Sequence, residues 1–566
     1  MRYMKVILKE NRKWVVVYLA IGLFNAFMAN FKADYFQRIV DGLTDRTITF
    51  YGILFYGGIL LVNYGMNYLD EYPSAKLKNG IYLDFKLLAL QKIGKMDYAA
   101  YQKLGTGKLV QQIENGADAG KGVLYDFCFC VVRNLLPTIL FSLYFIWKID
   151  RNITYFLLAG YIVIFIVTNL LLKGLYQIKE SILTNEEELS HFLVRGFMEM
   201  PVFRMKHYFS REVEKAFKAK RIIVSSKIKM TMIHEAFFTI FALLVACLDV
   251  GILTYAWKNS HLTVGSVVAL ITLIDNAYTP IAVFNVIFVQ YKLNKTAWLR
   301  FTELLDLKED RQLEEGISFH TLSNEIRVEN LSFSYGDKQV LKSVSLRIKK
   351  GEKVAFVGES GSGKSTLAKA LIGLLKYDEG DILFDETPLK RFSLASLYEK
   401  VSYLSQDAPV FDGTIRENLI FDKKISDTEI YASLEKTQLM PLISSLTNGL
   451  DTKIGEKGTC LSGGEKQRLA LTRLWLDAPE IIILDEATSA LDNITEHIIM
   501  KTLLKNAQDA TVISIAHRLS SIADFDRILL FKNGTIIGNG TFEDLLKSNN
   551  YFRGLYQKEN EKDQAK

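Results

Sequence analysis

The chain has 566 residues, of which 49% are hydrophobic and 23% are charged, and its mean hydropathy is +0.12. This length leaves room for two or more domains, and the hydropathy averages a strongly apolar half with an ordinary soluble half, which indicates a membrane protein that carries a cytosolic domain. The 69 basic and 63 acidic side chains leave a net charge of only +6, which gives no indication of nucleic-acid binding. The four cysteines have neither metal-ligand spacing nor a disulfide framework; they are Cys128, Cys130, Cys247 and Cys460.

The N-terminus begins with a basic stretch that is followed by an apolar run over 14–31. A secretory signal has a shorter apolar core and a cleavage site of small residues. Because this run is longer and further membrane segments follow it, we expect a retained first membrane helix.

Six stretches are apolar and long enough to cross a bilayer, which needs about 20 predominantly apolar residues. We expect them near 14–33, 50–70, 123–147, 153–172, 236–257 and 264–290. The two long connections, 73–121 and 173–229, are rich in lysine and arginine, and positive charge gathers in cytoplasmic loops. Both long connections and both termini are therefore predicted on the cytoplasmic side. Apolar residues at helical spacing in these connections indicate that the membrane helices continue into the cytosol.

The apolar pattern ends at an acid-rich stretch, and the alternating strands and helices of a soluble α/β domain follow it. The expected organisation is a membrane domain over 1–305, a linker over 306–324, an ATP-binding domain over 325–557 and a charged tail over 558–566.

The strongest chemical signal is a glycine-rich loop between an apolar strand at 354–357 and the helix that follows it. The loop residues are Gly358, Glu359, Ser360, Gly361, Ser362, Gly363, Lys364, Ser365 and Thr366. Glycines let successive backbone amides turn toward the β-phosphate of a nucleotide, a lysine reaches the β- and γ-phosphates, and a serine hydroxyl binds Mg²⁺. We therefore expect this loop to bind ATP, with Lys364 and Ser365 in those two roles.

A second signal is the apolar run 481–484, which ends in Asp485 and Glu486. It indicates a buried parallel strand that delivers two carboxylates at its C-terminal end. Asp485 would support Mg²⁺, and Glu486 would polarise the attacking water. Carboxylates commonly follow strands, so this pair alone is a weak indication.

Between these elements lies Leu461-Ser-Gly-Gly-Glu465, and with it the sequence resembles the ABC transporter ATPase family. The other family motifs are in order: Tyr335 in Phe333-Ser-Tyr-Gly, Gln406 in Leu-Ser-Gln-Asp, Gly455-Glu-Lys-Gly458, Ser489-Ala-Leu-Asp492, and His517 in Ile-Ala-His-Arg. The membrane half also resembles the six-helix exporter-type fold, so the resemblance covers the whole chain. It implies a half-transporter: a six-helix all-α transmembrane domain of ABC exporter type, followed by an α/β P-loop NTPase nucleotide-binding domain.

The resemblance also implies roles for these positions. Tyr335 would stack on adenine, and Gln406 would sense the γ-phosphate, Mg²⁺ and water. Ser462, Gly463 and Gly464 would cap the γ-phosphate of the nucleotide that the other subunit holds. Asp492 would reach across the dimer, and His517 would hold the γ-phosphate and Glu486 in hydrolytic geometry, since phosphoryl transfer asks mainly for positioning and charge compensation. Glutamine is commoner than Glu465 in the family, but both occur widely, so we expect an active ATPase.

Dimerisation is part of the implied mechanism, because the signature of one chain completes the phosphate site of another. The partner is a second half-transporter, identical or different. The segments 98–118 and 196–209 resemble the two coupling regions that rest on nucleotide-binding domains, in cis or in trans, and convert their movement into rocking of the membrane helices.

Two acidic residues, Asp249 and Asp275, lie inside predicted spans, where ionisable groups are costly and indicate function by default. Asparagines lie at similar depth: Asn25, Asn63, Asn67 and Asn276. These side chains would either line a polar cavity for a cationic or amphipathic cargo or join helices by hydrogen bonds. Arg133 follows Asp126 by seven residues, on about the same face of an α-helix, which favours a local ion pair.

The expected function is ATP-driven export of a small amphipathic molecule, drug, lipid or peptide across the cytoplasmic membrane. The alternative is import of a metal chelate or another small molecule with the same architecture. Six spans argue against a soluble mechanochemical or DNA-repair ATPase. A nucleotide-gated channel is a further alternative, and it would differ from a transporter in needing little ATP turnover. The motifs are compatible with different cargoes, with either direction of transport, and with a homodimer or a heterodimer.

Overall fold

The computed structural model describes residues 2–104, 106–258, 261–455, 458–507, 509–516 and 518–564, apart from the side chains of some helical residues, chiefly 163–176. The chain divides into two compact units. The membrane unit comprises Met1–Gly94 and Leu104–Leu307, and the ATPase unit comprises Lys95–Lys103 and Lys308–Lys566.

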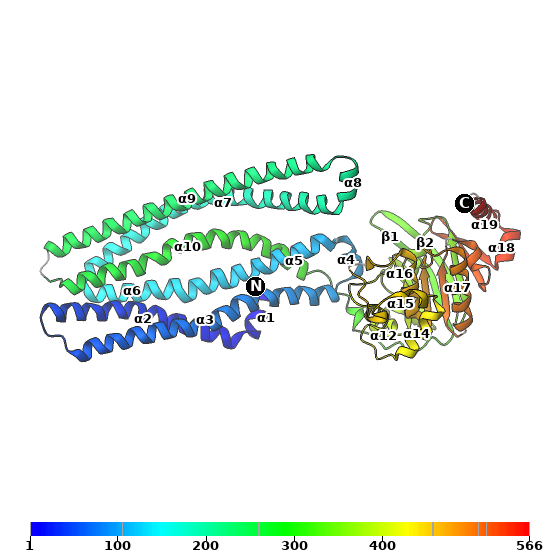
Figure 1. The fold of residues 1–566 in the computed structure, drawn as a ribbon, viewed down its shortest axis with the longest axis horizontal. Coiled ribbons are helices and arrows are strands. Elements are labelled where there is room, and N and C mark those ends of the chain that lie inside the picture. Colours follow the sequence, from blue (N-terminus) through cyan, green and yellow to red (C-terminus); the bar gives the residue numbers. More distant parts are fainter. Residues whose placement is uncertain are drawn as a thin grey trace. The chain divides into compact units, whose positions relative to one another are not determined.

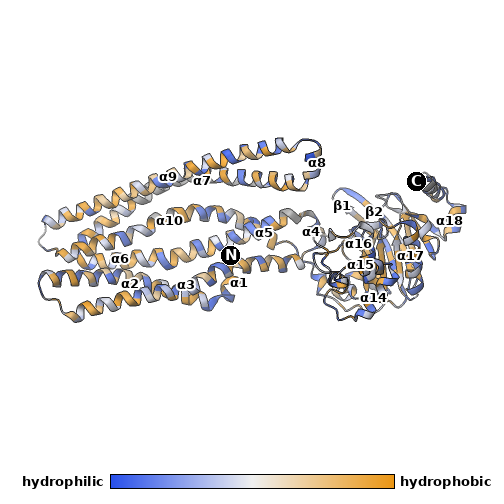
Figure 2. Ribbon diagram, viewed as in Figure 1, coloured by the Kyte–Doolittle hydropathy of each residue, from blue (hydrophilic) through white to orange (hydrophobic). Residues whose placement is uncertain are grey.

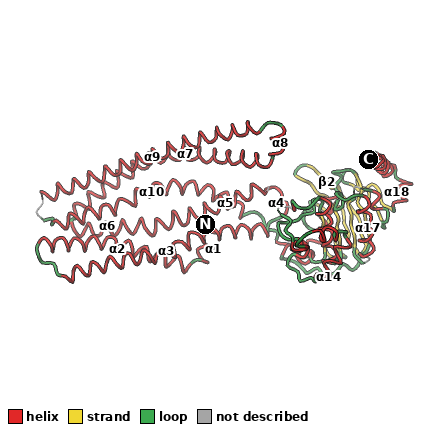
Figure 3. Tube along the Cα trace, in the orientation of Figure 1, coloured by secondary structure: helices red, strands yellow, loops and turns green. Residues whose placement is uncertain are grey.

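The membrane unit consists of long helices that run side by side (Figures 1 and 3). They are α1 (Arg2–Glu10), α2 (Arg12–Thr44), α3 (Phe50–Gly94), α5 (Thr106–Lys121), α6 (Leu136–Ile149), α7 (Arg151–Met198), α8 (Met200–Met205), α9 (Phe209–Lys258) and α10 (Val264–Leu305). Two π-helical segments, Gly122–Phe129 and Val131–Leu135, join α5 to α6. A cluster of buried apolar side chains from α2, α6, α7, α9 and α10 holds one part of the bundle together.

Within the part of the chain that the structure describes, four helical stretches are long and apolar enough to cross a membrane: Arg12–Thr44, Leu109–Ile149, Phe209–Lys258 and Val264–Leu305. Hydrophobic residues run along these helices (Figure 2). The other two predicted spans, 50–70 and 153–172, lie within the continuous helices α3 and α7. The count of six spans remains a prediction.

The membrane helices extend well beyond a bilayer, as the pattern in the long connections predicts. Helix α7 has 48 residues and α9 has 50, and at about 1.5 Å per residue each is roughly twice as long as the hydrocarbon core is thick. The two helices pack against each other and are joined by α8 (Figure 1). Near this turn, the buried carboxylate of Glu212 pairs with Arg195 of α7 and with Lys215, which fixes the geometry of the tip.

The predicted ion pair between Arg133 and Asp126 is wrong. Arg133 pairs with Asp70 of α3, donates a 3.1 Å hydrogen bond to the carbonyl oxygen of Tyr18, and lies 3.8 Å from the centre of the Tyr18 ring. The prediction assumed α-helical spacing, whereas this part of the chain is π-helical. The wider i→i+5 turn changes which residues share a face, so Arg133 points to the neighbouring helices instead.

The ATPase unit contains two sheets. A four-stranded antiparallel sheet has the order β2-β1-β4-β5, and a six-stranded sheet has the order β10-β9-β3-β8-β7-β6. The strands are β1 (Glu325–Tyr335), β2 (Lys338–Lys349), β3 (Lys353–Gly358), β4 (Glu379–Phe384), β5 (Thr387–Pro388), β6 (Val401–Leu404), β7 (Ile481–Asp485), β8 (Thr511–Ile515), β9 (Arg527–Lys532) and β10 (Thr535–Gly540). Strands β9, β3, β8, β7 and β6 are parallel, so their C-terminal ends share one edge.

Helices surround this sheet. They are α11 (Lys364–Leu371), α12 (Leu394–Tyr398), α13 (Ile415–Ile420), α14 (Asp427–Lys436), α15 (Met440–Ser445), α16 (Gly463–Asp477), α17 (Asn493–Asn506), α18 (Phe542–Ser548) and α19 (Asn550–Gln564). Helices α13 to α16 pack around an apolar cluster of their own. Helix α16 also contributes Ala470, Leu471 and Leu474 to an apolar cluster with strands of the six-stranded sheet, so it lies between the helical cluster and the sheet.

The ATPase unit includes two segments that flank the membrane helices in the chain. The acid-rich stretch after α10 packs on this unit through Phe319 and Leu322, which are buried in the sheet core. The segment before α5 contains the short helix α4 (Tyr98–Leu104), and Lys376 binds both Asp97 of this segment (3.2 Å) and Asp310 (2.7 Å). Part of the first predicted coupling region is therefore anchored to the chain's own ATPase unit.

Candidate ATP-binding and hydrolysis site

The glycine-rich loop lies between β3 and α11, as predicted. Gly363 has a φ of 104° and caps the N-terminus of α11 without a side chain. Gly358 has a φ of 152°, and an added Cβ there would collide with the carbonyl oxygen of Phe531 on the neighbouring strand. Glycine is therefore required at both positions. The loop leaves the backbone N–H groups at the start of α11 available to an anion.

Lys364 is buried, and its ammonium group donates to the carbonyl oxygens of Gly358 (2.7 Å) and Glu359 (2.9 Å) and to the Ser362 hydroxyl (3.3 Å). Burial lowers the pKa of Lys364, and the nearby carboxylates of Glu486 and Asp485 act in the opposite direction. The lysine is thus held within the phosphate loop, in the field of the two carboxylates that the sequence singles out.

Ser365 and Asp485 meet although they are 120 residues apart: the serine hydroxyl donates a 2.7 Å hydrogen bond to Oδ1 of Asp485. The other oxygen, Oδ2, accepts a 2.9 Å hydrogen bond from the hydroxyl of Tyr403 on β6. Burial, and then the charge of Asp485, raise the pKa of Tyr403, so it remains a donor. Tyr403 carries no motif, and sequence reasoning missed it.

A hydroxyl and a carboxylate oxygen are ligands of the kind that Mg²⁺ prefers, and Mg²⁺ in nucleotide sites takes only one or two protein ligands because phosphates and waters supply the rest. Among the described residues no group of three or more His, Cys, Asp or Glu side chains could hold a metal alone. The pair of Ser365 and Asp485 therefore fits a metal that arrives with the nucleotide.

Glu486 follows directly at the end of β7 and has a φ of 55°. A non-glycine residue in this region is strained, and such strain persists where the surroundings enforce it, often at active sites. Here its backbone N–H donates to the carbonyl oxygen of Ile515 on β8 (3.1 Å), and its own carbonyl accepts from Ser489 (3.1 Å). These bonds hold the carboxylate at the strand edge beside the phosphate loop.

Tyr335, predicted to stack on adenine, and Gln406, the predicted sensor of the γ-phosphate, both have exposed side chains. Tyr335 is 47% exposed at the end of β1, where its ring packs edge-on against Phe333. Gln406 is exposed just after β6. Both are accessible to a ligand. The predicted residue His517 lies outside the described residues, as does part of the motif 455–458.

The signature residues begin helix α16. Ser462 is its N-cap and forms a reciprocal capping box with Glu465. Burial works to raise the pKa of Glu465, but hydrogen bonds from the Ser462 backbone and hydroxyl outweigh it and lower the pKa. Among the described residues no hydrogen bond joins Ser462 to Lys364 or Ser365.

Asp492 is the N-cap of α17, where its carboxylate accepts a 2.9 Å hydrogen bond from the backbone N–H of Thr495. This bond lowers the pKa of Asp492. The side chain is exposed and ionised at neutral pH.

Comparison with known proteins agrees with this geometry. Residues 341–489 match the family model described as ABC transporter. An uncharacterized ABC transporter ATP-binding protein of Bacillus subtilis (strain 168), YwjA, is 30% identical over 516 residues, which cover 87% of this chain and 86% of that protein. The chain belongs to the ABC transporter family.

Other relatives match over nearly the whole length. ATP-dependent lipid A-core flippases from Alcanivorax borkumensis and Escherichia coli (strain K12) are 28% and 26% identical, over 89% and 94% of this chain and 86% and 92% of those proteins. The structure of a bacterial Atm1-family ABC exporter with ATP bound superposes with a TM-score of 0.82 at 23% identity and covers 98% of both chains. The chain is a half-transporter of exporter-type fold, with fused membrane and ATPase domains, and it couples ATP hydrolysis to transport. These expectations from the sequence are confirmed.

In this ABC transporter the polar residues of the membrane unit fall into two groups. Asn25 donates to Asn67 (3.1 Å), and Asn276 donates to Asn30 (3.5 Å), so these side chains join helices. Asp249 has one buried carboxylate oxygen without a hydrogen bond, and Asp275 is exposed. Contact of Asp249 or Asp275 with cargo remains a prediction.

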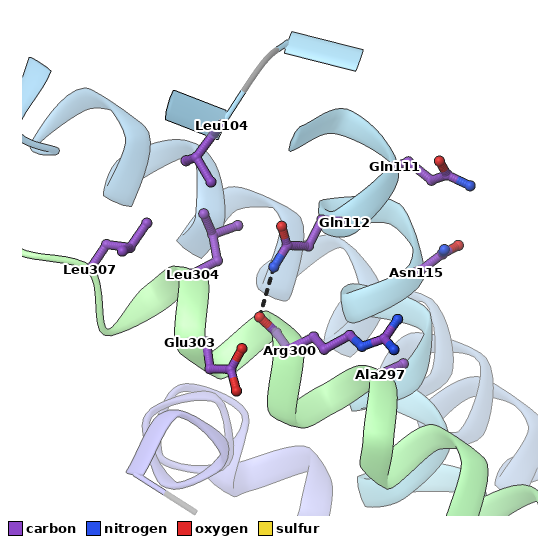
Figure 4. A pocket seen from close by; sticks show the side chains of 9 residues that line it. All are labelled: Leu104, Gln111, Gln112, Asn115, Ala297, Arg300, Glu303, Leu304 and Leu307. Carbon is purple, nitrogen blue, oxygen red and sulfur yellow. Dashed lines mark hydrogen bonds between the residues drawn. The ribbon is translucent and has the colours of Figure 1, made fainter. Parts of the chain in front are cut away.

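The membrane unit also contains cavities whose lining includes amide and charged side chains, which sequence reasoning did not anticipate. One cavity of about 620 Å³ lies between the segment 104–115, which includes the start of α5, and the C-terminal part of α10 (Figure 4). There the side chain of Gln112 donates a 2.8 Å hydrogen bond to the carbonyl oxygen of Arg300. A neighbouring cavity of about 410 Å³ shares Gln111, Asn115 and Arg300 with it and extends to α7. Amide side chains recur at helical spacing on α5, at 111 and 115, and on α10, at 290 and 294. This spacing is the sequence signal that could have indicated the lining of the cavities.

Proposed function

We propose that this half-transporter exports a small amphipathic molecule, lipid, drug or peptide across the cell membrane. It works as a dimer and uses the hydrolysis of Mg²⁺-ATP as its energy source. The observation that carries the proposal is the division of the site within one chain. Ser365 and Asp485 are hydrogen-bonded at the edge of the sheet, whereas among the described residues no hydrogen bond joins Ser462, the N-cap of α16, to Lys364 or Ser365. This division supports a site that is completed by the signature of a second subunit.

In the proposed closed dimer, Lys364 and the loop amides would hold the phosphates, and Ser365 and Gln406, supported by Asp485, would hold Mg²⁺. When bound, Mg²⁺ neutralises charge on the phosphates. Glu486 orients and polarises the attacking water, together with His517, and Tyr335 stacks on the adenine. Ser462, Gly463 and Gly464 of the opposing subunit close over the γ-phosphate with a hydroxyl and backbone N–H groups, and Asp492 lies at the interface between subunits.

The proposed location is the cytoplasmic membrane, with several spans and with the ATPase domain and both termini in the cytoplasm. The distribution of lysine and arginine supports this orientation. The segments 98–118 and 196–209 then link the ATPase domains to the membrane helices. Support for the first comes from the two ion pairs of Lys376 with Asp97 and Asp310.

An amphipathic cargo is supported by two features. Long apolar helices continue into a region whose cavities are lined both by leucines and by amides, Arg300 and Glu303, which suits a molecule with an apolar body and a polar head. Two similar proteins are named as lipid flippases. The exporter-type fold favours export over the alternative of metal-chelate import, and either a homodimer or a heterodimer fits the divided site.

Reconstitution of the chain alone in proteoliposomes tests the proposal. ATPase activity that is sensitive to vanadate, together with ATP-dependent movement of a fluorescent phospholipid out of the leaflet on the ATPase side, is expected. Glu486→Gln should abolish turnover while it keeps nucleotide binding. Persistent transport in that variant, or an absence of ATPase activity with every partner half-transporter supplied, contradicts the proposal.

A further inference from the structure

Gln467 lies on helix α16 five residues after Ser462 and is 4% exposed. Its side-chain amide makes three hydrogen bonds with loops from other parts of the ATPase unit. The nitrogen donates to the carbonyl oxygen of Gln406 (3.3 Å) and to the hydroxyl of Ser489 (3.1 Å), and the oxygen accepts from the backbone N–H of Ala490 (2.8 Å). Because the Ala490 N–H requires an acceptor and the other two partners are acceptors for the nitrogen, a single orientation of the amide satisfies all three.

The partners of Gln467 belong to two loops that serve different parts of the site. Gln406 is the exposed residue that follows β6, and Ser489 and Ala490 lie between Glu486 and Asp492. The second loop also packs directly on the signature: an added Cβ on Gly464 would lie 3.2 Å from the carbonyl oxygen of Ala490, and one on Gly463 would lie 3.5 Å from its Cβ. The signature, the loop after Glu486 and the Gln406 loop therefore meet at one buried amide.

A second side chain of α16 holds the same Gln406 loop further along. Arg473 is 9% exposed and donates to the carbonyl oxygens of Pro409 (3.0 Å) and Asn418 (2.8 Å), with its guanidinium 5.2 Å from the centre of the Phe421 ring. Two side chains of α16 thus bind the two ends of the segment 406–409: Gln467 binds Gln406, and Arg473 binds Pro409. A buried polar contact of this kind resists separation, because breaking it leaves unpaired polar groups.

We propose that Gln467 is a positioning residue that makes the two ATP sites of the dimer interdependent. The inference rests on the proposed function, in which Gln406 serves the nucleotide on its own subunit and the signature at the start of α16 serves the nucleotide of the opposing subunit. A displacement of the Gln406 loop on nucleotide binding moves α16 through the Gln467 amide, and the signature moves with it. Occupancy of one site then changes the geometry of the other, which is a coupling free energy between two sites.

The test uses the full-length chain in proteoliposomes without cargo, so that a failure of the export proposal does not affect it. In Gln467→Glu the side chain keeps its shape and its acceptor for Ala490, but it loses both N–H donors. A plot of ATPase rate against ATP concentration should give the parent a Hill coefficient clearly above 1 and up to about 2, since two sites are coupled, and the variant a coefficient of about 1. The maximal rate should fall roughly tenfold, while binding of a fluorescent ATP analogue without Mg²⁺ changes less than about twofold.

Two further variants separate coupling from stability. Asp477→Asn removes a surface ion pair with Lys423 at the far end of the same helix and should leave the Hill coefficient unchanged. Ser489→Ala removes one acceptor of the Gln467 amide and should lower the Hill coefficient even if Gln467→Glu does not fold. A merely structural role of Gln467 would lower the midpoint of thermal unfolding with the Hill coefficient intact. That result, a parent Hill coefficient of 1, or an unchanged coefficient in Ser489→Ala would overturn the proposal.

Discussion

The carboxylate of Glu465 accepts two hydrogen bonds of 2.7 Å from Ser462, one from its hydroxyl and one from its backbone N–H. The hydroxyl proposed to bind the γ-phosphate of the opposing subunit is therefore already held by an anion at the N-terminus of α16. A carboxylate here stabilises the helix and also repels the incoming phosphate. Closure of the dimer over ATP has to work against this charge.

We expect Glu465→Gln to lower the KM for ATP by roughly twofold to fivefold, the range for an exposed charge interaction of about 0.4 to 1 kcal/mol. The effect should shrink at high salt, because screening weakens it. Glu429→Gln is a matched control, since Glu429 completes a second capping box, with Ser426 on α14. An equal change of KM in both variants would assign the effect to helix capping.

The pH dependence of the change in KM follows from the direction in which the pKa of Glu465 is shifted. The pKa of Glu465 lies below its usual value of 4.5, so the side chain is ionised throughout the range from pH 6 to 8. Its capping contribution to stability is present above the pKa of the unfolded chain and is lost as pH falls through the folded pKa. The ratio of KM values between parent and Glu465→Gln should therefore stay constant from about pH 6 to 8. A ratio that approaches one within this range contradicts an ionised Glu465.

Tyr403 should matter for the metal rather than for the nucleotide. Its hydroxyl fixes Oδ2 of Asp485 while Ser365 fixes Oδ1. In Tyr403→Phe we expect the Mg²⁺ concentration for half-maximal ATPase activity to rise roughly tenfold, since a hydrogen bond to a charged group contributes about 1.5 kcal/mol or more. Binding of a fluorescent ATP analogue in EDTA should not change. Tyr431→Phe on α14 serves as the control, and a loss of binding in EDTA would instead indicate damage to the phosphate loop.

The phosphate loop and the strand that ends in Asp485 were predictable because each is a local pattern, in which residue types and spacing within one segment determine the structure. The contacts of Tyr403, Gln467 and Arg473 were not, because they join residues 22 to 82 positions apart and have no local signature. The Arg133 prediction failed for a related reason: a seven-residue spacing has meaning only if the helix type is known, and the π-helical segments became evident only in the structure.

The ion pair of Arg133 and Asp70 should contribute to the thermal stability of the membrane unit. The side chains are 9% and 18% exposed, and Gly22 leaves the space that Arg133 fills beside Tyr18. Removal of one partner leaves a largely buried charge, which costs about 3 to 5 kcal/mol, whereas replacement of both by apolar residues is often neutral. We therefore expect Arg133→Met to lower the midpoint of thermal unfolding of the detergent-solubilised chain strongly, and Asp70→Leu to restore most of the loss when it is added. The four proteins of this double-mutant cycle measure the coupling directly. If the two losses simply add, Arg133 stabilises the bundle through Tyr18 and its packing alone, and the charge of Asp70 is satisfied elsewhere.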